Sequence, residues 1–296
     1  MILGAVNISA TRHDILHWYD RHARDLPWRR PACPPWGVFV SEVMLQQTPV
    51  NRVEPAWHAW MERWPDPAAL AAEAPGEAVR MWDRLGYPRR ALRLHAAATA
   101  MVEHHDGRVP DTEERLLTLP GVGAYTAAAV AAFAFGQRAT VVDTNIRRVH
   151  ARLVTGEALP QPSLTRAESA LAATLLPEAP ATSVRWNVAC MELGALICTA
   201  RTPRCAQCPV KTSCAWQRAG CPPYTGKAHR GQAWAGTDRQ ARGALMAVAR
   251  AAAGPVDAAD LRAAWPTDDL QRERCLVSLV SDGLLVPVGD GRHALP

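Results

Sequence analysis

Residues 198–214 read Cys198-Thr199-Ala200-Arg201-Thr202-Pro203-Arg204-Cys205-Ala206-Gln207-Cys208-Pro209-Val210-Lys211-Thr212-Ser213-Cys214, which spaces four cysteines as C-x6-C-x2-C-x5-C. Four thiolates in one short loop can hold an iron–sulfur cluster, and few protein types carry this spacing directly after a helical domain. Structural zinc sites usually pair their ligands as two C-x2-C units, whereas this stretch contains one. We therefore expect a 4Fe-4S cluster, with zinc or no metal as the alternatives, and the expected ligands are Cys198, Cys205, Cys208 and Cys214.

The composition is that of an ordered globular protein. Of the 296 residues, 48% are apolar and 21% are charged, which excludes a disordered or fibrous chain. The 33 basic and 28 acidic residues give a net charge of +5, which is mild evidence for a polyanionic partner. Lys211 and Lys227 are the only lysines, so arginine carries nearly all the positive charge.

The sequence contains no recognisable export or membrane signal. Residues 1–10 lack the basic start and long apolar run of a signal peptide, and the longest apolar stretch, residues 124–135, is too short to span a bilayer. We therefore expect a cytoplasmic protein that contacts no membrane. In a reducing compartment, the eight cysteines indicate metal binding rather than disulfides.

Most of the chain before the cysteine loop reads as helices that are separated by proline or glycine. The expected helices cover residues 36–47, 56–63, 68–72, 77–85, 91–103, 113–117, 124–135, 145–154, 166–176 and 184–196. No convincing alternating strand pattern occurs before the C-terminal part. The sequence therefore predicts an all-α fold up to the cysteine loop.

The C-terminal part reads as a separate small module. Residues 222–237 are rich in Gly, Pro and polar side chains and lack an apolar period, which is typical of a linker. Beyond the linker, we expect helices over residues 239–252, 258–265 and 269–281, and a hairpin over 284–295. This order predicts a winged-helix-like module over residues 238–296. The module either binds nucleic acid or packs as a small domain without doing so.

The sequence Leu119-Pro120-Gly121-Val122-Gly123 matches a helix-hairpin-helix turn within residues 113–135. Two glycines let the backbone turn tightly and leave free N–H groups at the start of the next helix, where the partial positive charge suits a phosphate. By itself, such a turn is also an ordinary helix connector. Together with the cysteine loop, it indicates that Gly121 and Gly123 bind the DNA backbone without reading bases.

Two acidic residues are candidates for catalysis. Asp143 follows two β-branched apolar residues and precedes an expected helix. It is therefore either a simple N-cap or a carboxylate at the edge of the core that can stabilise a developing cation. Glu42 shares one helical face with Val38 and Leu45, and burial on that face would raise its pKa, as a general acid needs.

The chain resembles the helix-hairpin-helix DNA glycosylases that carry an iron–sulfur cluster, and most closely the adenine DNA glycosylases. The resemblance runs from about residue 12 to residue 217. It rests on the turn with Tyr125-Thr126, the Asp143 segment, the cysteine loop, Leu26-Pro27-Trp28-Arg29, Ser41-Glu42-Val43-Met44-Leu45-Gln46-Gln47-Thr48, Leu85-Gly86-Tyr87 and Glu192-Leu193-Gly194-Ala195-Leu196-Ile197-Cys198. The string from Ser41 to Thr48 is the specific part, because relatives of the endonuclease III type share the turn and the cysteines but not that string.

This resemblance implies a two-lobed all-α fold. Residues 1–28 together with 136–221 would form an iron–sulfur cluster lobe, and residues 29–135 a six-helix barrel lobe that includes the helix-hairpin-helix motif. Many bacterial members end in a larger Nudix-like domain that reads 8-oxoguanine on the opposite strand. Residues 238–296 are too short and too helical for such a domain, which leaves the reading of 8-oxoguanine open. We also expect a monomer that associates with the nucleoid.

The resemblance further implies a base excision repair enzyme that extrudes an adenine from double-stranded DNA and hydrolyses its N-glycosidic bond. The adenine would be mispaired with 8-oxoguanine or guanine. Glu42 matches the general acid that protonates N7, and Asp143 matches the carboxylate that stabilises the oxocarbenium-like sugar. Asn145 and Tyr125 match supporting polar groups.

The expected DNA contacts lie in the same matched strings. Gln47 and Tyr87 match residues that wedge into the base stack near the lesion, a role that is consistent with kinking the duplex. Thr48 and Arg29 are further expected contacts, in addition to the two glycines of the turn.

The scarcity of lysine bears on the reaction type. Relatives that also cleave the strand need an amine for a Schiff base and carry a lysine at the position of Tyr125. No lysine precedes the cysteine loop here, which leaves only the N-terminal amine, so we expect simple hydrolysis to an abasic site.

Two other functions stay open. One is a thymine- or uracil-mismatch glycosylase on the same scaffold, whose pyrimidine substrates have no N7 to protonate. The other is an iron–sulfur DNA-binding regulator, which does not require two carboxylates.

Overall fold

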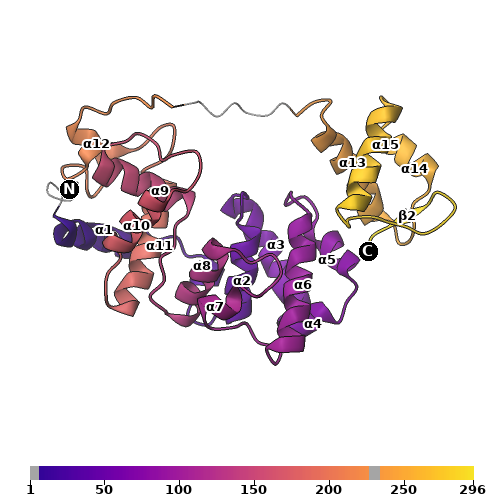
Figure 1. Ribbon diagram of the computed structural model, residues 1–296, viewed down its shortest axis with the longest axis horizontal. Helices are drawn as coiled ribbons and strands as arrows, with labels where there is room; N and C mark the ends of the chain where they lie inside the picture. The colour runs from indigo at the N-terminus through magenta and orange to yellow at the C-terminus, as the bar shows by residue number, and fades with distance from the viewer. Residues whose placement is uncertain (1–6, 227–233) are drawn as a thin grey trace. The chain divides into compact units, whose positions relative to one another are not determined.

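The computed structural model describes residues 7–226 and 234–296, which are mostly helical (Figure 1). Contacts between residues divide the chain into two compact units. Unit 1 lies within residues 1–35, 111–114 and 123–228, and unit 2 within residues 36–110, 115–122 and 229–296. The domain boundaries expected from the sequence stay a prediction, and the expected linker falls partly on residues 227–233, outside the described residues. None of the described helices combines the length and the apolar composition that crossing a membrane requires.

Unit 2 starts with a group of consecutive helices: α2 (Pro35–Met44), α3 (Val50–Arg63), α4 (Pro67–Ala71), α5 (Pro75–Trp82) and α6 (Arg89–His104). Helix α6 packs against α4 and α5, and α5 also contacts α3. Helices α4 and α5 start on Pro67 and Pro75, because the fixed φ and missing N–H of proline suit the first helical position. These short helices therefore begin at prolines that the sequence analysis places between the expected helices.

Tryptophans form the centre of unit 2. The ring of Trp60 meets those of Trp64 and Trp82 edge to face, with centroids 4.6 and 5.7 Å apart, and all three side chains are buried. The indole N–H of Trp36 donates to the carbonyl oxygen of Trp64 at 2.9 Å. Each such aromatic pair contributes about 0.5–1.5 kcal/mol beyond its buried area, so this cluster fixes α3 and α5 against each other.

The C-terminal module of unit 2 comprises α13 (Asp238–Ala251), α14 (Ala258–Ala264), α15 (Asp269–Ser281) and an antiparallel hairpin of β1 (Val286–Pro287) and β2 (His293–Ala294). Three helices and a hairpin thus occur in the order that the sequence predicts. Thr237, Asp257 and Asp268 cap the three helices, because each side chain accepts an N–H of the first turn. Helix α13 packs against α14 and α15 and also contacts α5.

Unit 1 is built around α11. Its elements are α1 (Ile8–His22), the 3-10 turn η2 (Pro27–Arg29), α8 (Ala124–Phe135), α9 (Thr144–His150), the π-helical turn η3 (Ala151–Thr155), α10 (Arg166–Leu175), α11 (Pro180–Leu196), the 3-10 turn η4 (Cys205–Gln207) and α12 (Ala215–Arg218). Helix α11 packs against α1 and α9, and α10 packs against α9. Helix α9, which follows Asp143, is therefore supported by two longer helices.

The helix starts that differ most from the sequence prediction are those of α1 and α3. No helix was expected before residue 36, yet α1 forms there, since Asn7 caps it and Ile15 and Trp18 bury one of its faces. Helix α3 begins at Val50 rather than at residue 56. Pro55 lies inside this helix, where it removes one backbone hydrogen bond without ending the helix.

The glycine turn connects α7 (Glu113–Leu116) to α8, in the order expected of the helix-hairpin-helix sequence. The N–H of Val122 donates to the carbonyl oxygen of Leu119 at 3.2 Å, and Gly121 adopts a φ of 77°. A Cβ at Gly121 would lie 2.7 Å from the Cβ of Arg93. Glycine is therefore required at this position for its left-handed backbone and for the close approach of Arg93.

Candidate functional site

Asp143 is the N-cap of α9. Its Oδ1 accepts the backbone N–H of Ile146 at 2.6 Å, and its Oδ2 accepts a side-chain N–H of Asn145 at 2.7 Å. Burial raises the pKa of Asp143 above its usual range, although these hydrogen bonds and the charge of Arg148 offset part of the effect. The carboxylate is thus held in one orientation and partly withdrawn from water, as suits a group that stabilises a nearby cation.

Asn145 and Arg148 connect this carboxylate to the cysteine loop. Oδ1 of Asn145 accepts from Nη2 of Arg148 at 2.8 Å, and the same guanidinium donates to the carbonyl oxygens of Gly194 at 2.7 Å and of Cys198 at 2.6 Å. A Cβ at Gly194 would lie 2.6 Å from the Cβ of Asn145, so glycine permits this approach. A continuous path of hydrogen bonds therefore runs from Asp143 to the backbone of the first cysteine.

The four loop cysteines influence one another electrostatically. Burial raises the pKa values of Cys205, Cys208 and Cys214, that of Cys208 to about 12, and the charges of other cysteines in the set raise them further. Nη1 of Arg152 lies 3.4 Å from Sγ of Cys198 and can donate to it. Among residues 7–226 and 234–296, no three His, Cys, Asp or Glu side chains form a group that could hold a single metal ion.

Arg152 also orders the backbone at the start of this loop. Its guanidinium donates to the carbonyl oxygens of Thr199 at 2.7 Å and Ala200 at 3.0 Å, and it lies 4.7 Å from the ring centroid of Trp216. The side chain is buried. The loop is therefore tied to η3 by a charged group that the sequence prediction did not include.

Gly123 and Tyr125 lie at the start of α8. Gly123 is the N-cap residue, it is exposed, and the space that a Cβ would occupy is open. The side chain of Tyr125 is half-buried. The helix start is therefore accessible, and phosphate binding at Gly121 and Gly123 stays a prediction.

Glu42 lies near the end of α2 and is only 4% exposed. All residues from Trp36 to Met44 are buried, so Glu42 belongs to a fully buried stretch of α2. The carbonyl oxygens of Val43 and Met44 accept from Nη1 of Arg90 at 3.0 and 2.9 Å. The end of the helix that carries Glu42 is thus fixed by a buried arginine.

Gln47 and Thr48 belong to the loop after α2. Gln47 is exposed and has a φ of 57°, a left-handed conformation that costs a non-glycine residue about 1–2 kcal/mol. Thr48 is buried, and its hydroxyl donates to the carbonyl oxygen of Leu85 at 3.2 Å and accepts from Nη2 of Arg90 at 2.9 Å. Thr48 therefore fixes the loop from inside, and its expected contact with DNA stays a prediction.

Tyr87 lies in a second loop of unit 2. It is 48% exposed, with a φ of 48°. The guanidinium of Arg90 lies 5.6 Å from its ring centroid and 5.0 Å from that of Trp82. Burial lowers the pKa of Arg90 to about 10, which leaves the group charged at neutral pH. The structure thus brings the loops of Gln47 and Tyr87 together around one buried cation.

Arg29 is paired with a buried carboxylate of unit 1. Its Nη1 lies 2.9 Å from Oε2 of Glu192, and Nε of Arg24 lies 2.6 Å from Oε1 of the same residue. Burial alone would raise the pKa of Glu192, but the two arginines outweigh it and hold the pKa below its usual range. The structure places Arg29 in this ion pair, and its contact with DNA stays a prediction.

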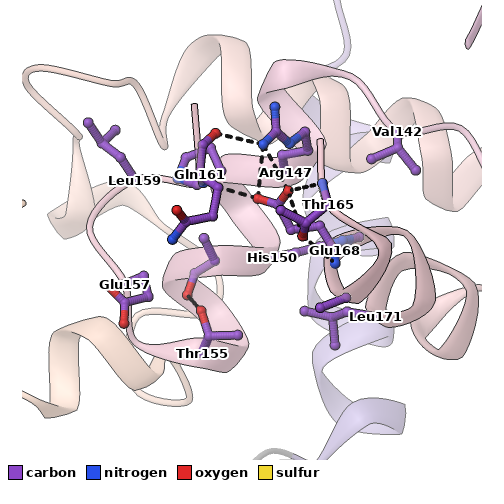
Figure 2. Close-up of a pocket in the computed structure, with 13 residues that line it drawn as sticks. Val142, Arg147, His150, Thr155, Glu157, Leu159, Gln161, Thr165, Glu168 and Leu171 are labelled. Atoms are coloured by element: carbon purple, nitrogen blue, oxygen red, sulfur yellow. Dashed lines mark hydrogen bonds and ion pairs between the residues drawn. The ribbon is translucent and has the colours of Figure 1, made fainter. Parts of the chain in front are cut away.

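A pocket of about 190 Å³ lies beside α9, η3 and α10 (Figure 2). Arg147 pairs with Glu168 at 2.8 Å, and the same carboxylate accepts the N–H of Thr165 at 2.9 Å; dashed lines mark both contacts in Figure 2. Burial lowers the pKa of His150 on the pocket wall to about 4, so its ring is neutral at pH 7. The pocket lining in the described part of the chain includes none of the predicted site residues. Its polar contacts tie α10 to the helix that Asp143 caps.

Arg90, Arg148 and Arg152 are the residues that the sequence analysis missed. The guanidinium of each donates mainly to backbone carbonyl oxygens, most of which are far away in the sequence. Such contacts leave no residue pattern. The one available signal was the spacing of Asn145 and Arg148, which are three residues apart in an expected helix and therefore share a face.

Comparisons with known proteins agree with this fold. Residues 40–173 match the family model described as HhH-GPD superfamily base excision DNA repair protein. The adenine DNA glycosylase of Mycobacterium tuberculosis (strain ATCC 25618 / H37Rv) is 52% identical over 300 residues, which cover 100% of this chain and 98% of that protein. The Homo sapiens adenine DNA glycosylase is 43% identical over 215 residues, 70% of this chain and 39% of that protein. The solved structure of a thermostable thymine-DNA glycosylase is 28% identical, with a TM-score of 0.64, over 72% of this chain and 97% of that one.

Proposed function

The chain belongs to the adenine DNA glycosylase family, and from this premise we propose that it removes adenine that is mispaired with 8-oxoguanine or guanine in double-stranded DNA. The observation that supports the proposal most is the Asp143 carboxylate, which is oriented by Ile146 and Asn145 and partly shielded from water. We propose that the enzyme acts as a monomer.

In the proposed reaction, Glu42 donates a proton to N7 of an extruded adenine, the C1′–N9 bond breaks, and the bonding electrons leave with the base. The sugar becomes an oxocarbenium-like cation, which the negative charge of Asp143 stabilises. Water then adds at C1′ and loses a proton, which leaves an abasic site. The hydrogen bond from Asn145 supports the orientation of Asp143, and Tyr125 is a supporting polar group.

The proposed DNA contacts are supported by local backbone strain. Gln47 and Tyr87 are both exposed residues with positive φ, and the loops of both are held by Arg90. Exposed residues that have a strained backbone and lie in a firmly held loop are typical of ligand contacts. This supports the role of both residues as wedges in the base stack. Gly121 and Gly123 would bind phosphate oxygens at the start of α8.

We also propose that Cys198, Cys205, Cys208 and Cys214 bind a 4Fe-4S cluster. The donor set fits, because four thiols that influence one another electrostatically stand in one loop, and Arg152 directs an N–H at Cys198. A bound cluster would offset part of the negative charge of the thiolates and hold the loop in one shape. Arg148 would then transmit that shape to Asn145 and Asp143 through its hydrogen bonds.

Iron content tests the cluster. The purified chain is expected to show broad visible absorbance and bound iron, and Cys198→Ala is expected to lose most of both. Cys33→Ala is the matched control, since Cys33 lies outside the set and should keep full absorbance. Stoichiometric zinc in place of iron would contradict the proposal.

The substrate is tested with duplexes that contain A:8-oxoguanine, A:G, T:G or U:G pairs. The unaltered chain is expected to release adenine from the first two, and strand breaks are expected only after alkali, because no lysine precedes the cysteine loop. The similarity to a thymine-DNA glycosylase supports a mismatch thymine glycosylase as the second candidate. Release of thymine without adenine would favour that candidate, and strand cleavage before alkali would contradict simple hydrolysis.

A further inference from the structure

We infer that the C-terminal module completes a surface on which an unstacked nucleobase of the bound duplex stacks. Its members are Tyr87 from the loop before α6, Arg239 from α13 and Trp234 from the turn before α13; we call these three side chains the stacking surface. The inference rests on the proposed function, because it requires a DNA substrate.

Aromatic rings and guanidinium groups alternate from the core of unit 2 to this surface. Arg90 lies between the rings of Trp82 and Tyr87, at 5.0 and 5.6 Å, and Arg239 lies between those of Tyr87 and Trp234, at 5.7 and 5.3 Å. The exposed fraction is 0% for Trp82, 48% for Tyr87 and 55% for Trp234. The buried ring of Trp82 therefore holds the series in place, and the exposed rings of Tyr87 and Trp234 are accessible to a ligand.

Specific contacts hold the module against the helices beside Tyr87. Nη1 of Arg80 on α5 donates to the carbonyl oxygen of Ala252 at 2.8 Å. Arg89 on α6 pairs with Asp282 at 3.2 Å, and the same carboxylate pairs with Arg242 on α13 at 2.6 Å. These contacts join α5 and α6 to both ends of the module's helix pair, so Arg239 is placed over Tyr87 by the docked module.

The turn that carries Trp234 is also fixed. The hydroxyl of Thr237 donates to the carbonyl oxygen of Trp234 at 2.8 Å, and Nε2 of Gln271 on α15 donates to that of Gly236 at 3.0 Å. Arg239 follows in the first turn of α13, where a positive charge opposes the helix dipole. The ion pairs among the described residues do not involve Arg239. Its position is thus unfavourable for the helix but suitable for a negatively charged ligand.

The chemistry of the stacking surface matches nucleic acid. Every base has a π-face, so aromatic rings bind unstacked bases without regard to sequence, and arginine adds stacking by its planar guanidinium and attraction to the phosphate backbone. An exposed tyrosine and an exposed tryptophan with an arginine between them supply both interactions.

The exposed face of α15 is a poorer candidate for the module's contact with DNA. Leu270 is 81% and Val277 61% exposed, Glu273 is exposed as well, and Arg274 is paired with Asp238 at 2.7 Å. A helix that enters a DNA groove needs basic side chains for the phosphates. The corner of Trp234 and Arg239 is therefore the part of the module that meets DNA.

Equilibrium binding of the full chain tests this inference. The probe is a duplex with 2′-fluoro-2′-deoxyadenosine opposite guanine, in which the fluorine disfavours the sugar cation and slows hydrolysis. Trp234→Ala and Arg239→Ala are each expected to weaken binding about tenfold, the effect of one lost stacking contact. Arg262→Ala removes an exposed arginine elsewhere in the module and is expected to bind like the unaltered chain.

Arg239→Lys separates stacking from charge, since lysine keeps the charge but lacks the planar group. This variant is expected to bind about as weakly as Arg239→Ala. Binding restored by lysine, or alanine variants that bind as tightly as Arg262→Ala, would overturn the stacking surface. Failure of the unaltered chain to release adenine from any duplex would instead overturn the proposed function, so the two failures are distinguishable.

Discussion

Replacing Asp143 with asparagine is expected to slow adenine release about a thousandfold, the upper range for removal of one preorganised electrostatic group. The asparagine can still accept the N–H of Ile146 and so cap α9, but it carries no charge to stabilise the sugar cation. Single-turnover release from an A:G duplex measures the effect. Affinity for the duplex with 2′-fluoro-2′-deoxyadenosine is expected to stay nearly unchanged.

The matched control is Asp66→Asn. Asp66 caps α4 in the same manner, with Oδ1 accepting the N–H of Ala69 at 2.8 Å, but it stands outside the proposed site. This variant should release adenine at the rate of the unaltered chain. An Asp143→Asn protein that is as active as this control would mean that Asp143 is only a helix cap.

The raised pKa of Asp143 also predicts how folding stability and adenine release change with pH. Because the folded protein holds this proton to a higher pH than the unfolded chain, ionisation removes folding stability as the pH rises from the usual aspartate value through the raised pKa. Activity needs the ionised form, so release should fall as the pH is lowered through that same range. The residual activity of Asp143→Asn should lack this acid-side decline.

Several helices could be predicted from the sequence because their ends carry proline or a capping side chain. Pro67, Pro75 and Thr165 mark such ends, and the predicted starts of these helices lie within two residues of the observed ones. Helix α1 was missed because its buried face is narrow and most of its other positions are polar. The start of α3 was placed too late because Pro55 was taken as a breaker, although a proline in the second turn costs only one hydrogen bond.

The candidate site was predictable only where its chemistry needs rare residues in a fixed order. Four cysteines in one loop and an aspartate at a helix start are such patterns. Arg90 was not predictable, and Arg148 only through its spacing from Asn145, since each satisfies carbonyl oxygens that become neighbours only after folding. The buried arginines therefore hold the loops in place through contacts that no sequence motif reveals.

Replacing Glu42 with glutamine is expected to lower adenine release by about a thousandfold, within the range for loss of a general acid. Glutamine has nearly the same shape and fits the buried position on α2, but it cannot transfer a proton to N7. Single-turnover release from an A:G duplex is the measurement, and thermal unfolding should show that the fold is kept. Glu62→Gln, at an exposed position of α3, is the matched control and should not change the rate.

A base analogue tests the same step from the side of the substrate. When adenine is replaced by an analogue with C–H in place of N7, the proton from Glu42 has no acceptor, so even the unaltered chain should release the base very slowly. Glu42→Gln should then add little to the defect, because both changes remove one proton transfer. Two separate, multiplying losses would show that Glu42 acts on another atom, and normal release of the analogue would remove the reason for assigning protonation of N7 to this residue.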